Sequence, residues 1–494
     1  MLLWLLVNVA TILFCALAQD VTMLKQRLAA HGVSAVYPVD DNFTALSQAY
    51  NMRFNFTPVA IVFPASIPQV SVAVVAGAAQ KLEVVARSGG HSYIANGLGG
   101  NNGALVVDMR NLKAITVRSS NNTAIIETGN RLGNLALALN AAGRAIPHGT
   151  CSYIGIGGHS GYGGFGFASR MWGLMLDTVK SATVVLANGT IVPTSAHVNT
   201  DLFWAICGAS PSFGIVASIE VQTFKAPSST IVFEYTWDSL DIPTAATAIS
   251  SFQTFARTNI PPEFGAELVL RKGPSRGTVS FAWTAAYYGD TGAHATVAPF
   301  LKSLPKPSNA TITPGSYINS VLVLSGKPLD TSAAPDVTDA FYTKSLMTPE
   351  SAPMSAAAIT AFVTYMATQG YSSETNWYVE VELYGGSNSA VNAVPLDATA
   401  FAKRDTLFTF QFHASSPDGK PPYPSDGFTF MDGMVASILD NEPANWPYGA
   451  YLNYMDDRLA NAASLYYGTH YARLKSIKAS VDPQNVFRFP VGVA

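Results

Sequence analysis

Cysteine is scarce in this 494-residue chain, which contains three. Cys15 lies in an apolar stretch at the N-terminus, so Cys151 and Cys207 are the two that remain for the rest of the chain. Two cysteines form one bridge at most, which excludes a disulfide framework. The histidines do not recur at metal-ligand spacing in the sequence, and we therefore expect no metal site.

Charge is also low, because charged residues make up 12% of the chain, the formal net charge is -3, and no run of one sign occurs. These values argue against a nucleic-acid partner and against a polybasic membrane patch. Hydrophobic residues make up 48%, as in a compact globular enzyme. The length allows about two to four domains. We expect a monomer with no stable membrane association.

The N-terminal residues 1–18 are almost wholly apolar and end in a small-x-small pattern at Ala16 and Ala18. This pattern favours a cleaved signal peptide, although the missing positive region leaves an uncleaved membrane anchor as the alternative. No later segment is long and apolar enough to cross a bilayer. Together with five glycosylation sequons the leader predicts a secreted glycoprotein. The sequons begin at Asn42, Asn55, Asn121, Asn188 and Asn309.

Two kinds of pattern divide the chain. Residues up to about 225 mix short strands, such as 82–87, with helices, such as 132–142, in an α+β manner. From residue 231 to about 446 long alternating strands are separated by helices, which predicts an antiparallel sheet with helices on one face. A C-terminal helix is expected over 457–481.

The densest local signal is the glycine-rich stretch 148–166, HGTCSYIGIGGHSGYGGFG. Glycine loses more backbone entropy on folding than other residues, so such a run indicates close approach to a ligand, for example phosphate oxygens held by backbone N–H groups. Gly161 to Gly166 match G-x-G-x-x-G, but no hydrophobic strand precedes them. Asp177 also lies too close to this motif in the sequence to be the acidic residue that binds the ribose of a dinucleotide. We therefore reject a Rossmann site and favour a phosphate cradle over a purely structural loop.

Several segments, in the same order along the chain, resemble the berberine-bridge-enzyme-like group of the vanillyl-alcohol-oxidase superfamily. R-S-G-G-H-S-Y at 87–93 resembles the segment whose histidine bonds the flavin 8α-methyl group. H-G-T-C at 148–151, with G-I-G-G-H after it, resembles the segment whose cysteine bonds flavin C6. The segments 201–216, 451–454 and 482–487 resemble further family motifs, so the match covers nearly the whole mature chain.

This resemblance implies a two-domain α+β flavoprotein. Residues 19–228 would form the FAD-binding domain, residues 229–447 a substrate domain with an antiparallel sheet covered by helices, and residues 448–494 a segment that completes the FAD domain. FAD would be bonded covalently to His91 and Cys151. The other implied cofactor-binding residues are Arg87, Ser88, Gly89, Gly90, Ser92, Gly155, Gly157, Gly158, His159, Gly161, Gly163, Ile215 and Asn453.

Within the family the chain looks most similar to fungal oligosaccharide oxidases, through the segments 377–386, 410–412 and 451–454. Those enzymes oxidise the anomeric carbon of a reducing sugar to a lactone and pass the electrons to oxygen, which gives hydrogen peroxide. The resemblance implies that Tyr454 is the catalytic base and that Glu382 assists it. It also implies a set of substrate-binding residues, Tyr93, Glu380, Tyr384 and Gln411.

The chain departs from those oxidases at several positions. Glu382 stands where they have an aspartate, and Glu380 where they have a glutamine. Residues i and i+2 of a strand share a face, so this site is more acidic and its substrate can differ. Ile154 replaces a valine or leucine near the flavin edge where oxygen reacts, which leaves oxidase and dehydrogenase both open. The segment 207–211 replaces the usual arginine and glycine run.

Without the family resemblance, the residue patterns allow other roles for the site residues and other functions for the protein. Glu380 and Glu382 alternate with apolar residues as in any half-buried strand, and Tyr454 also fits a buried aromatic side chain with a bonded hydroxyl. Members of the same family act on alkaloids, polyketide intermediates and aromatic alcohols. An oxidase or dehydrogenase of a secondary metabolite or an aromatic alcohol is therefore the alternative function, and a secreted protein that only keeps the fold is a third.

Overall fold

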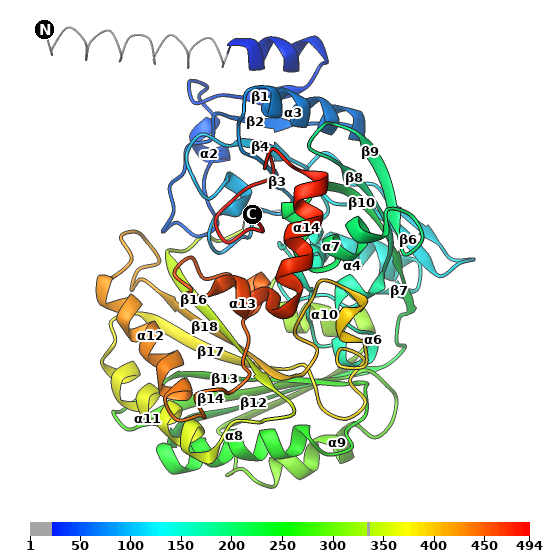
Figure 1. Cartoon of the computed structure of the whole chain (residues 1–494). Coiled ribbons are helices and arrows are strands. Elements are labelled where there is room, and N and C mark those ends of the chain that lie inside the picture. Colours follow the sequence, from blue (N-terminus) through cyan, green and yellow to red (C-terminus); the bar gives the residue numbers. More distant parts are fainter. Residues whose placement is uncertain (1–21, 333–335) are drawn as a thin grey trace, which may run out of the picture.

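The computed structural model describes residues 22–332 and 336–494, so the expected signal peptide lies outside the described residues. The helices and strands form two parts that meet along one broad contact (Figure 1). One part contains a four-stranded and a five-stranded sheet, and the other contains a single large sheet. None of the helices within the described residues is long and apolar enough to span a membrane.

The first part contains two main sheets. The four-stranded sheet is parallel except for its first strand, and its order is β1 (Ser34–Val36), β2 (Ala60–Phe63), β4 (Leu105–Asp108), β3 (Val84–Arg87). The five-stranded sheet is antiparallel, and its order is β5 (Ile115–Arg118), β6 (Thr123–Glu127), β10 (Ile215–Gln222), β8 (Val179–Val185), β9 (Ile191–Ser195). The strands β7 (Arg144–Ala145) and β11 (Phe224–Lys225) pair separately.

Helices of this part pack their apolar residues between and around the sheets. They are α2 (Phe43–Leu46), α3 (Ile67–Ala79), α4 (Leu132–Ala141), α5 (Ile156–Tyr162), α6 (Ser169–Trp172) and α7 (Thr200–Ala209). The helix α3 begins after Ser66 with a proline in its first turn, as expected for a helix start.

The second part is built on a seven-stranded antiparallel sheet. Its order is β15 (Asn309–Gly315), β12 (Thr230–Asp241), β14 (Thr278–Tyr287), β13 (Phe264–Lys272), β17 (Asn376–Leu383), β18 (Thr406–Ser415), β16 (Phe341–Pro349). The helices are α8 (Ile242–Ala256), α9 (Ala293–Leu301), α10 (Tyr317–Ser325), α11 (Ala356–Ser372) and α12 (Ser425–Leu439).

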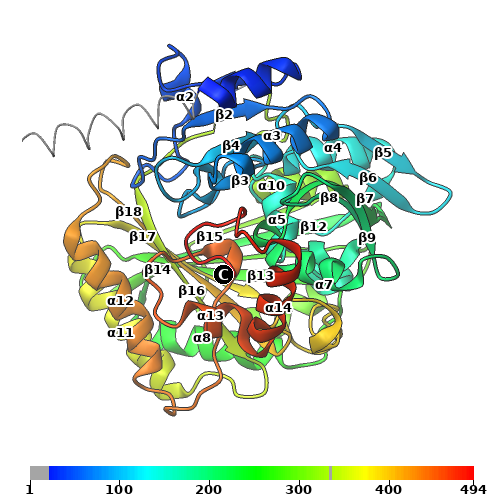
Figure 2. The ribbon, with the colours of Figure 1, turned by 45° about the horizontal axis from the view of Figure 1, so that its top comes forward.

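The two faces of this sheet have different neighbours. In both views α8, α11 and α12 cover the face that points away from the first part (Figures 1 and 2). Apolar residues of the strands, such as Val379, Val381 and Leu268, pack under these helices in one large core. The alternate residues, including Glu380 and Glu382, face the first part. Strand alternation therefore places the polar residues where the two parts meet.

The C-terminal segment returns to the first part after leaving the large sheet. Leu474 and Ile477 of α14 (Tyr471–Val481) pack in one core with residues of α7. The backbone N–H of Val84 in β3 donates to the carbonyl of Val486 at 3.0 Å, and Nζ of Lys478 donates to the carbonyl of Ser212 at 2.7 Å. This segment is therefore an integral piece of the first part.

The expectation of one helix over 457–481 is wrong. The chain forms α13 (Ala462–Tyr467), a 3-10 turn over Gly468–His470 and then α14. Gly468 has φ +52° and ψ -133°, a conformation that glycine adopts easily and that a helix does not contain. The helical periodicity in the sequence continues across this break, so it did not reveal the break.

Candidate active site

A cavity of about 550 Å³ lies between the two parts. Both glycine-rich loops, the polar face of the large sheet and the C-terminal segment line it. Most residues that the sequence assigned to cofactor or substrate line this cavity together. They are Arg87, Ser88, Gly89, Gly90, His91, Ser92, Tyr93, Cys151, Gly155, Gly157, Gly158, His159, Glu380, Glu382, Gln411, Asn453 and Tyr454.

The two glycine-rich loops touch through their backbones. A Cβ atom on Gly89 would lie 2.2 Å from the backbone nitrogen of Gly155, and one on Gly155 would lie 2.0 Å from that of Gly89. Ser88 joins the loops as well, because its Oγ accepts a hydrogen bond from the N–H of Gly157 at 3.2 Å. Only glycine fits at this contact, so the two loops form one continuous wall.

His91 and Cys151 are brought together on this wall. A ring nitrogen of His91, Sγ of Cys151 and a carboxylate oxygen of Asp336 all lie within 4.8 Å of one another. Two nucleophilic side chains at this separation fit attachment to two nearby positions of one ring system, as the expected flavin requires. The absence of a metal site stays a prediction, because this triplet and a second one of three glutamates have metal-ligand spacing in space.

Arg87 has a structural role in addition to its place in the wall. Its Nε lies 2.6 Å from Oδ2 of Asp108, and its Nη1 donates to the carbonyl of Leu46 at 2.7 Å. The guanidinium thereby ties the end of β3 to β4 and to the C-terminal end of α2. His159 is buried, and its Nε2 accepts from the N–H of Gly149 at 3.1 Å. Burial lowers the pKa of His159 to about 3, so it is neutral.

Tyr454 and Glu382 meet at the floor of the cavity. The 3-10 turn Leu452–Tyr454 carries the tyrosine, and β17 carries the glutamate. The phenolic hydroxyl donates to Oε1 of Glu382 at 2.8 Å, while Oε2 of Glu382 is buried without a protein partner. Burial raises the pKa of both groups well above their usual values, and the negative charge of Glu382 raises that of Tyr454 further. Tyr454 is therefore a neutral phenol in the resting site.

Tyr93 and Gln411 lie beside this pair. The Tyr93 ring stacks on the Tyr454 ring, with 5.9 Å between the ring centroids, and its hydroxyl accepts from Nε2 of Gln411 at 2.7 Å. Gln411 of β18 stands opposite Glu380 of β17 in the sheet. Five predicted residues from four segments of the chain thus surround one spot: Tyr93, Glu380, Glu382, Gln411 and Tyr454.

Glu267 is a site residue that sequence reasoning missed. It lies on β13 opposite Glu382, and carboxylate oxygens of Glu267, Glu380 and Glu382 lie within 4.8 Å of one another. Burial raises the pKa of Glu380 to about 7 and that of Glu267 well above its usual range. Glu267 stands in the sequence as a single acid within the apolar run 264–270, but its pairing with Glu382 depends on strand register.

Four predicted residues lie outside the cavity lining. Tyr384 is fully buried and stacks on Phe165, with 3.8 Å between ring centroids, because the chain leaves the sheet after Leu383. Ile215 packs in the core of the first part, whereas its neighbours Gly214 and Val216 line the cavity. The other two are Gly161 and Gly163, which pack beside Ser210 and Tyr451. Tyr384 and Ile215 are thus placed as core residues.

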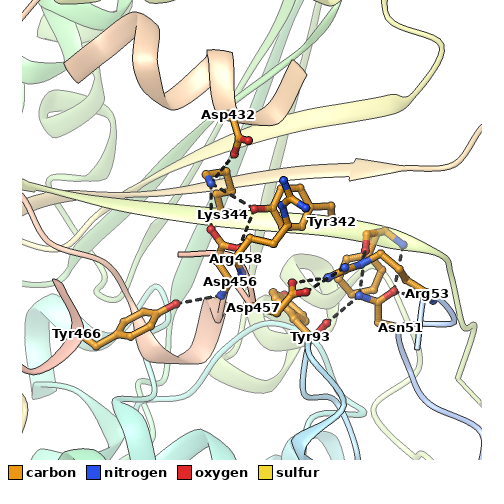
Figure 3. A network of polar contacts seen from close by, with 11 residues as sticks. Asn51, Arg53, Tyr93, Tyr342, Lys344, Asp432, Asp456, Asp457, Arg458 and Tyr466 are labelled. Atoms are coloured by element: carbon orange, nitrogen blue, oxygen red, sulfur yellow. Dashed lines mark hydrogen bonds and ion pairs between the residues drawn. The ribbon is translucent and has the colours of Figure 1, made fainter. Parts of the chain in front are cut away.

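A buried polar network supports the segments that carry Tyr93 and Tyr454 (Figure 3). Asp456, two residues after Tyr454, accepts from the Tyr342 hydroxyl at 2.7 Å and lies 3.0 Å from Nζ of Lys344. The N–H of Asp456 donates to the hydroxyl of Tyr466. On the other side, Nδ2 of Asn51 donates to the carbonyl of Tyr93 at 2.7 Å. The network joins the N-terminal loop, the large sheet and the C-terminal segment around the site.

Comparison with known proteins agrees with this geometry. Residues 58–195 match the FAD binding domain family, and residues 450–494 match the family described as berberine and berberine like. The chain is 37% identical to the chitooligosaccharide oxidase of Gibberella zeae over 90% of this chain and 89% of that protein. It is 34% identical to an FAD-linked oxidoreductase of Metarhizium anisopliae over 91% and 87% of the two chains.

A solved structure is similar over nearly the whole length. It is a glucooligosaccharide oxidase from Acremonium strictum described with a 6-S-cysteinyl, 8α-N1-histidyl FAD. The TM-score is 0.88 at 33% identity, and the match covers 95% of this chain and 99% of that one. The chain belongs to the berberine-bridge-enzyme-like family of FAD-linked oxidases, within the vanillyl-alcohol-oxidase superfamily.

Proposed function

We propose that the protein oxidises C1 of a reducing oligosaccharide to a lactone and passes the electrons to molecular oxygen, which gives hydrogen peroxide. The observation that carries this proposal is the hydrogen bond between Tyr454 and Glu382 at the floor of the cavity. Similar proteins named for chito- and gluco-oligosaccharides support a sugar as the substrate. We expect the protein to act as a monomer.

FAD is held covalently by His91 and Cys151 in this proposal. The closeness of their reactive atoms and the double linkage described for a related enzyme support it. Backbone N–H groups of the glycine-rich loops would bind the phosphates, because these loops present bare backbone to the cavity. When bound, FAD supplies the hydride acceptor and the route to oxygen.

The protein supplies a proton acceptor for the sugar hydroxyl. Tyr454 is protonated at rest, so it accepts a proton only if its own proton leaves at the same time. Oε1 of Glu382 receives that proton across the 2.8 Å hydrogen bond. Glu382 must be ionised beforehand, and the raised pKa that burial gives it makes its carboxylate a strong proton acceptor.

Glu267, Glu380, Gln411 and Tyr93 would bind the other hydroxyl groups of the terminal sugar. All four line the cavity next to Tyr454, and carboxyl and amide groups can accept or donate to hydroxyls. Tyr50, Tyr93 and Tyr378 also line the cavity and would give the sugar apolar contact through their ring edges.

We also propose that the protein is secreted and glycosylated. All five sequon asparagines, which lie in separate segments, are exposed in the structure. An exposed asparagine is accessible to glycosylation, whereas a buried one is not. Protein purified from the culture medium should lose mass on treatment with a peptide-N-glycosidase, and retention of all protein inside the cells would contradict this proposal.

The test of the sugar proposal is peroxide release and product analysis. Purified protein should release peroxide with at least one of cello-, xylo-, malto- or chito-oligosaccharides or lactose, and the sugar product should carry a C1 carboxyl after lactone hydrolysis. Peroxide release with aromatic alcohols and with no sugar would instead support the alternative function.

A further inference from the structure

His91 lies against Asp336 of the second part, which is itself paired with Lys327. Its Nε2 lies 3.0 Å from Oδ2 of Asp336, and Oδ1 of Asp336 lies 2.8 Å from Nζ of Lys327. The Tyr50 ring stacks on the imidazole, with 4.1 Å between the centroids. The tyrosine thus covers one face of the imidazole, and the carboxylate lies beside its Nε2.

Charge and burial together determine the protonation states of Asp336 and His91. The contacts with His91 and Lys327 outweigh burial and lower the pKa of Asp336 to about 2, so the carboxyl is ionised. Burial lowers the pKa of His91 below 6.5 despite the opposing effect of Asp336, so the imidazole is neutral at neutral pH. An ionised carboxylate favours the tautomer with the proton on Nε2, which leaves the lone pair on Nδ1.

We propose that Asp336, held by Lys327, is a positioning residue for covalent attachment of FAD to His91. It directs the Nδ1 lone pair to the flavin and stabilises the positive charge that develops on the imidazole as the bond forms. A buried aspartate acts on a histidine in this way in catalytic triads. The inference rests on the covalent linkage proposed above.

The reaction balances with molecular oxygen as oxidant. The bond from Nδ1 to the 8α-carbon forms and one C–H bond of that methyl group breaks. The C–H electron pair ends on the flavin ring, and oxygen then takes two electrons from the ring. The methyl proton and the Nε2 proton leave with these electrons as hydrogen peroxide.

Lys327 and Asp336 come from a different part of the molecule than His91, which links flavin attachment to the docking of the two parts. Lys327 and Asp336 lie in the connection between α10 and β16, whereas His91 follows β3 of the first part. In this proposal attachment at His91 is therefore faster once the two parts have docked. Asp336 is also within 4.8 Å of Cys151, and after burial its charge helps to raise the pKa of that thiol. Removing this charge makes the thiol easier to ionise and does not slow its reaction, so the bond at Cys151 serves as an internal reference.

The experiment compares full-length wild type, Asp336→Asn, Asp336→Glu and Asp330→Asn. Each is produced with limiting riboflavin, given FAD in air, quenched over time and analysed by peptide mass for flavin on His91 and on Cys151. Asp330 is the matched control, because it is an exposed aspartate of the same connection. We expect the His91 adduct in Asp336→Asn to form at least about tenfold more slowly, as is typical when a carboxylate behind a functional histidine is removed. The Cys151 adduct should still form, and Asp336→Glu should recover part of the rate.

The pH profile separates positioning from a general loss of structure. Because Asp336 raises the pKa of His91, its removal should move the acid limb of the attachment rate to lower pH while the plateau falls. A His91 adduct that forms at the wild-type rate in Asp336→Asn would overturn the inference alone. Loss of both adducts in folded Asp336→Asn would also count against it, since the role would then be general. A wild type with no flavin on His91 would instead refute the covalent linkage in the proposed function.

Discussion

The hydroxyl of Tyr454 donates a hydrogen bond of 2.8 Å to Oε1 of Glu382, and the two residues are 72 positions apart in the chain. The tyrosine comes from the C-terminal segment and the glutamate from the large sheet, so the pair exists only after the chain has closed around the cavity. Burial raises the pKa of both groups, and the hydrogen bond couples the protonation of one to that of the other. Their shared proton is the basis of the proposed chemistry.

Glu382→Gln should remove the acid limb of the pH profile. In the wild type Glu382 must be ionised, and its pKa is raised well above 4.5, chiefly by burial. Wild-type kcat/KM should therefore fall as pH decreases through this raised pKa. Glutamine keeps the size and accepts a hydrogen bond but cannot take a proton, so activity should drop by about 10²–10⁴-fold and lose that limb. If Glu382→Gln kept the acid limb of the pH profile unchanged, the titration seen there would belong to another group.

Glu380→Gln should shift the same limb to lower pH. The charge of Glu380 is the second cause that raises the pKa of Glu382, after burial, so its removal makes Glu382 easier to ionise. The pKa of Glu380 itself is about 7, so the effect should be largest above neutral pH, where it is charged. The measurement is kcat/KM against pH, with Glu374→Gln as control because Glu374 is exposed just before β17. A shift to higher pH would contradict the charge arrangement described here.

Lys344→Met should destabilise the protein strongly. Its ammonium lies 3.0 Å from Asp456, whose side chain is 2% exposed, so the variant leaves a buried carboxylate without its cation. Loss of one partner of a buried ion pair reduces the free energy of unfolding by about 3–5 kcal/mol. Arg473→Met is the control, because its pair with Asp201 is 46% and 69% exposed and should contribute about 0–1 kcal/mol. Urea unfolding that showed equal effects for the two variants would refute the structural role of this network.

Much of the site could be predicted because local motifs encode it. The loops around His91 and Cys151 are recognisable by their glycines, and the alternation of Glu380 and Glu382 with apolar residues places them on one face of a strand. The prediction of an antiparallel sheet with helices on one face agrees with the structure, since long alternating strands bury one side under helices. Each of these features depends on residues close together in the sequence.

Other site residues depend on long-range placement. Glu267 joins the site through its register with Glu382, and Asp336 lies in an irregular connection with no periodic pattern. The spacing of Tyr384 from Glu382 continues the polar face in the sequence, whereas in the structure the strand ends at Leu383 and Phe165 covers the ring. Strand register and strand ends are set by packing across the whole sheet, so a single sequence does not specify them.

The most direct test is anaerobic flavin bleaching by the sugar panel, with wild type compared with Tyr454→Phe. Tyr454→Phe keeps the ring that stacks on Tyr93 and removes only the hydroxyl that contacts Glu382. Tyr371→Phe is the matched control, because Tyr371 does not line the cavity. The account predicts that a reducing oligosaccharide bleaches the wild type, and that Tyr454→Phe is bleached about 10²–10⁴-fold more slowly while both flavin bonds remain. Bleaching of Tyr454→Phe at the wild-type rate would contradict it.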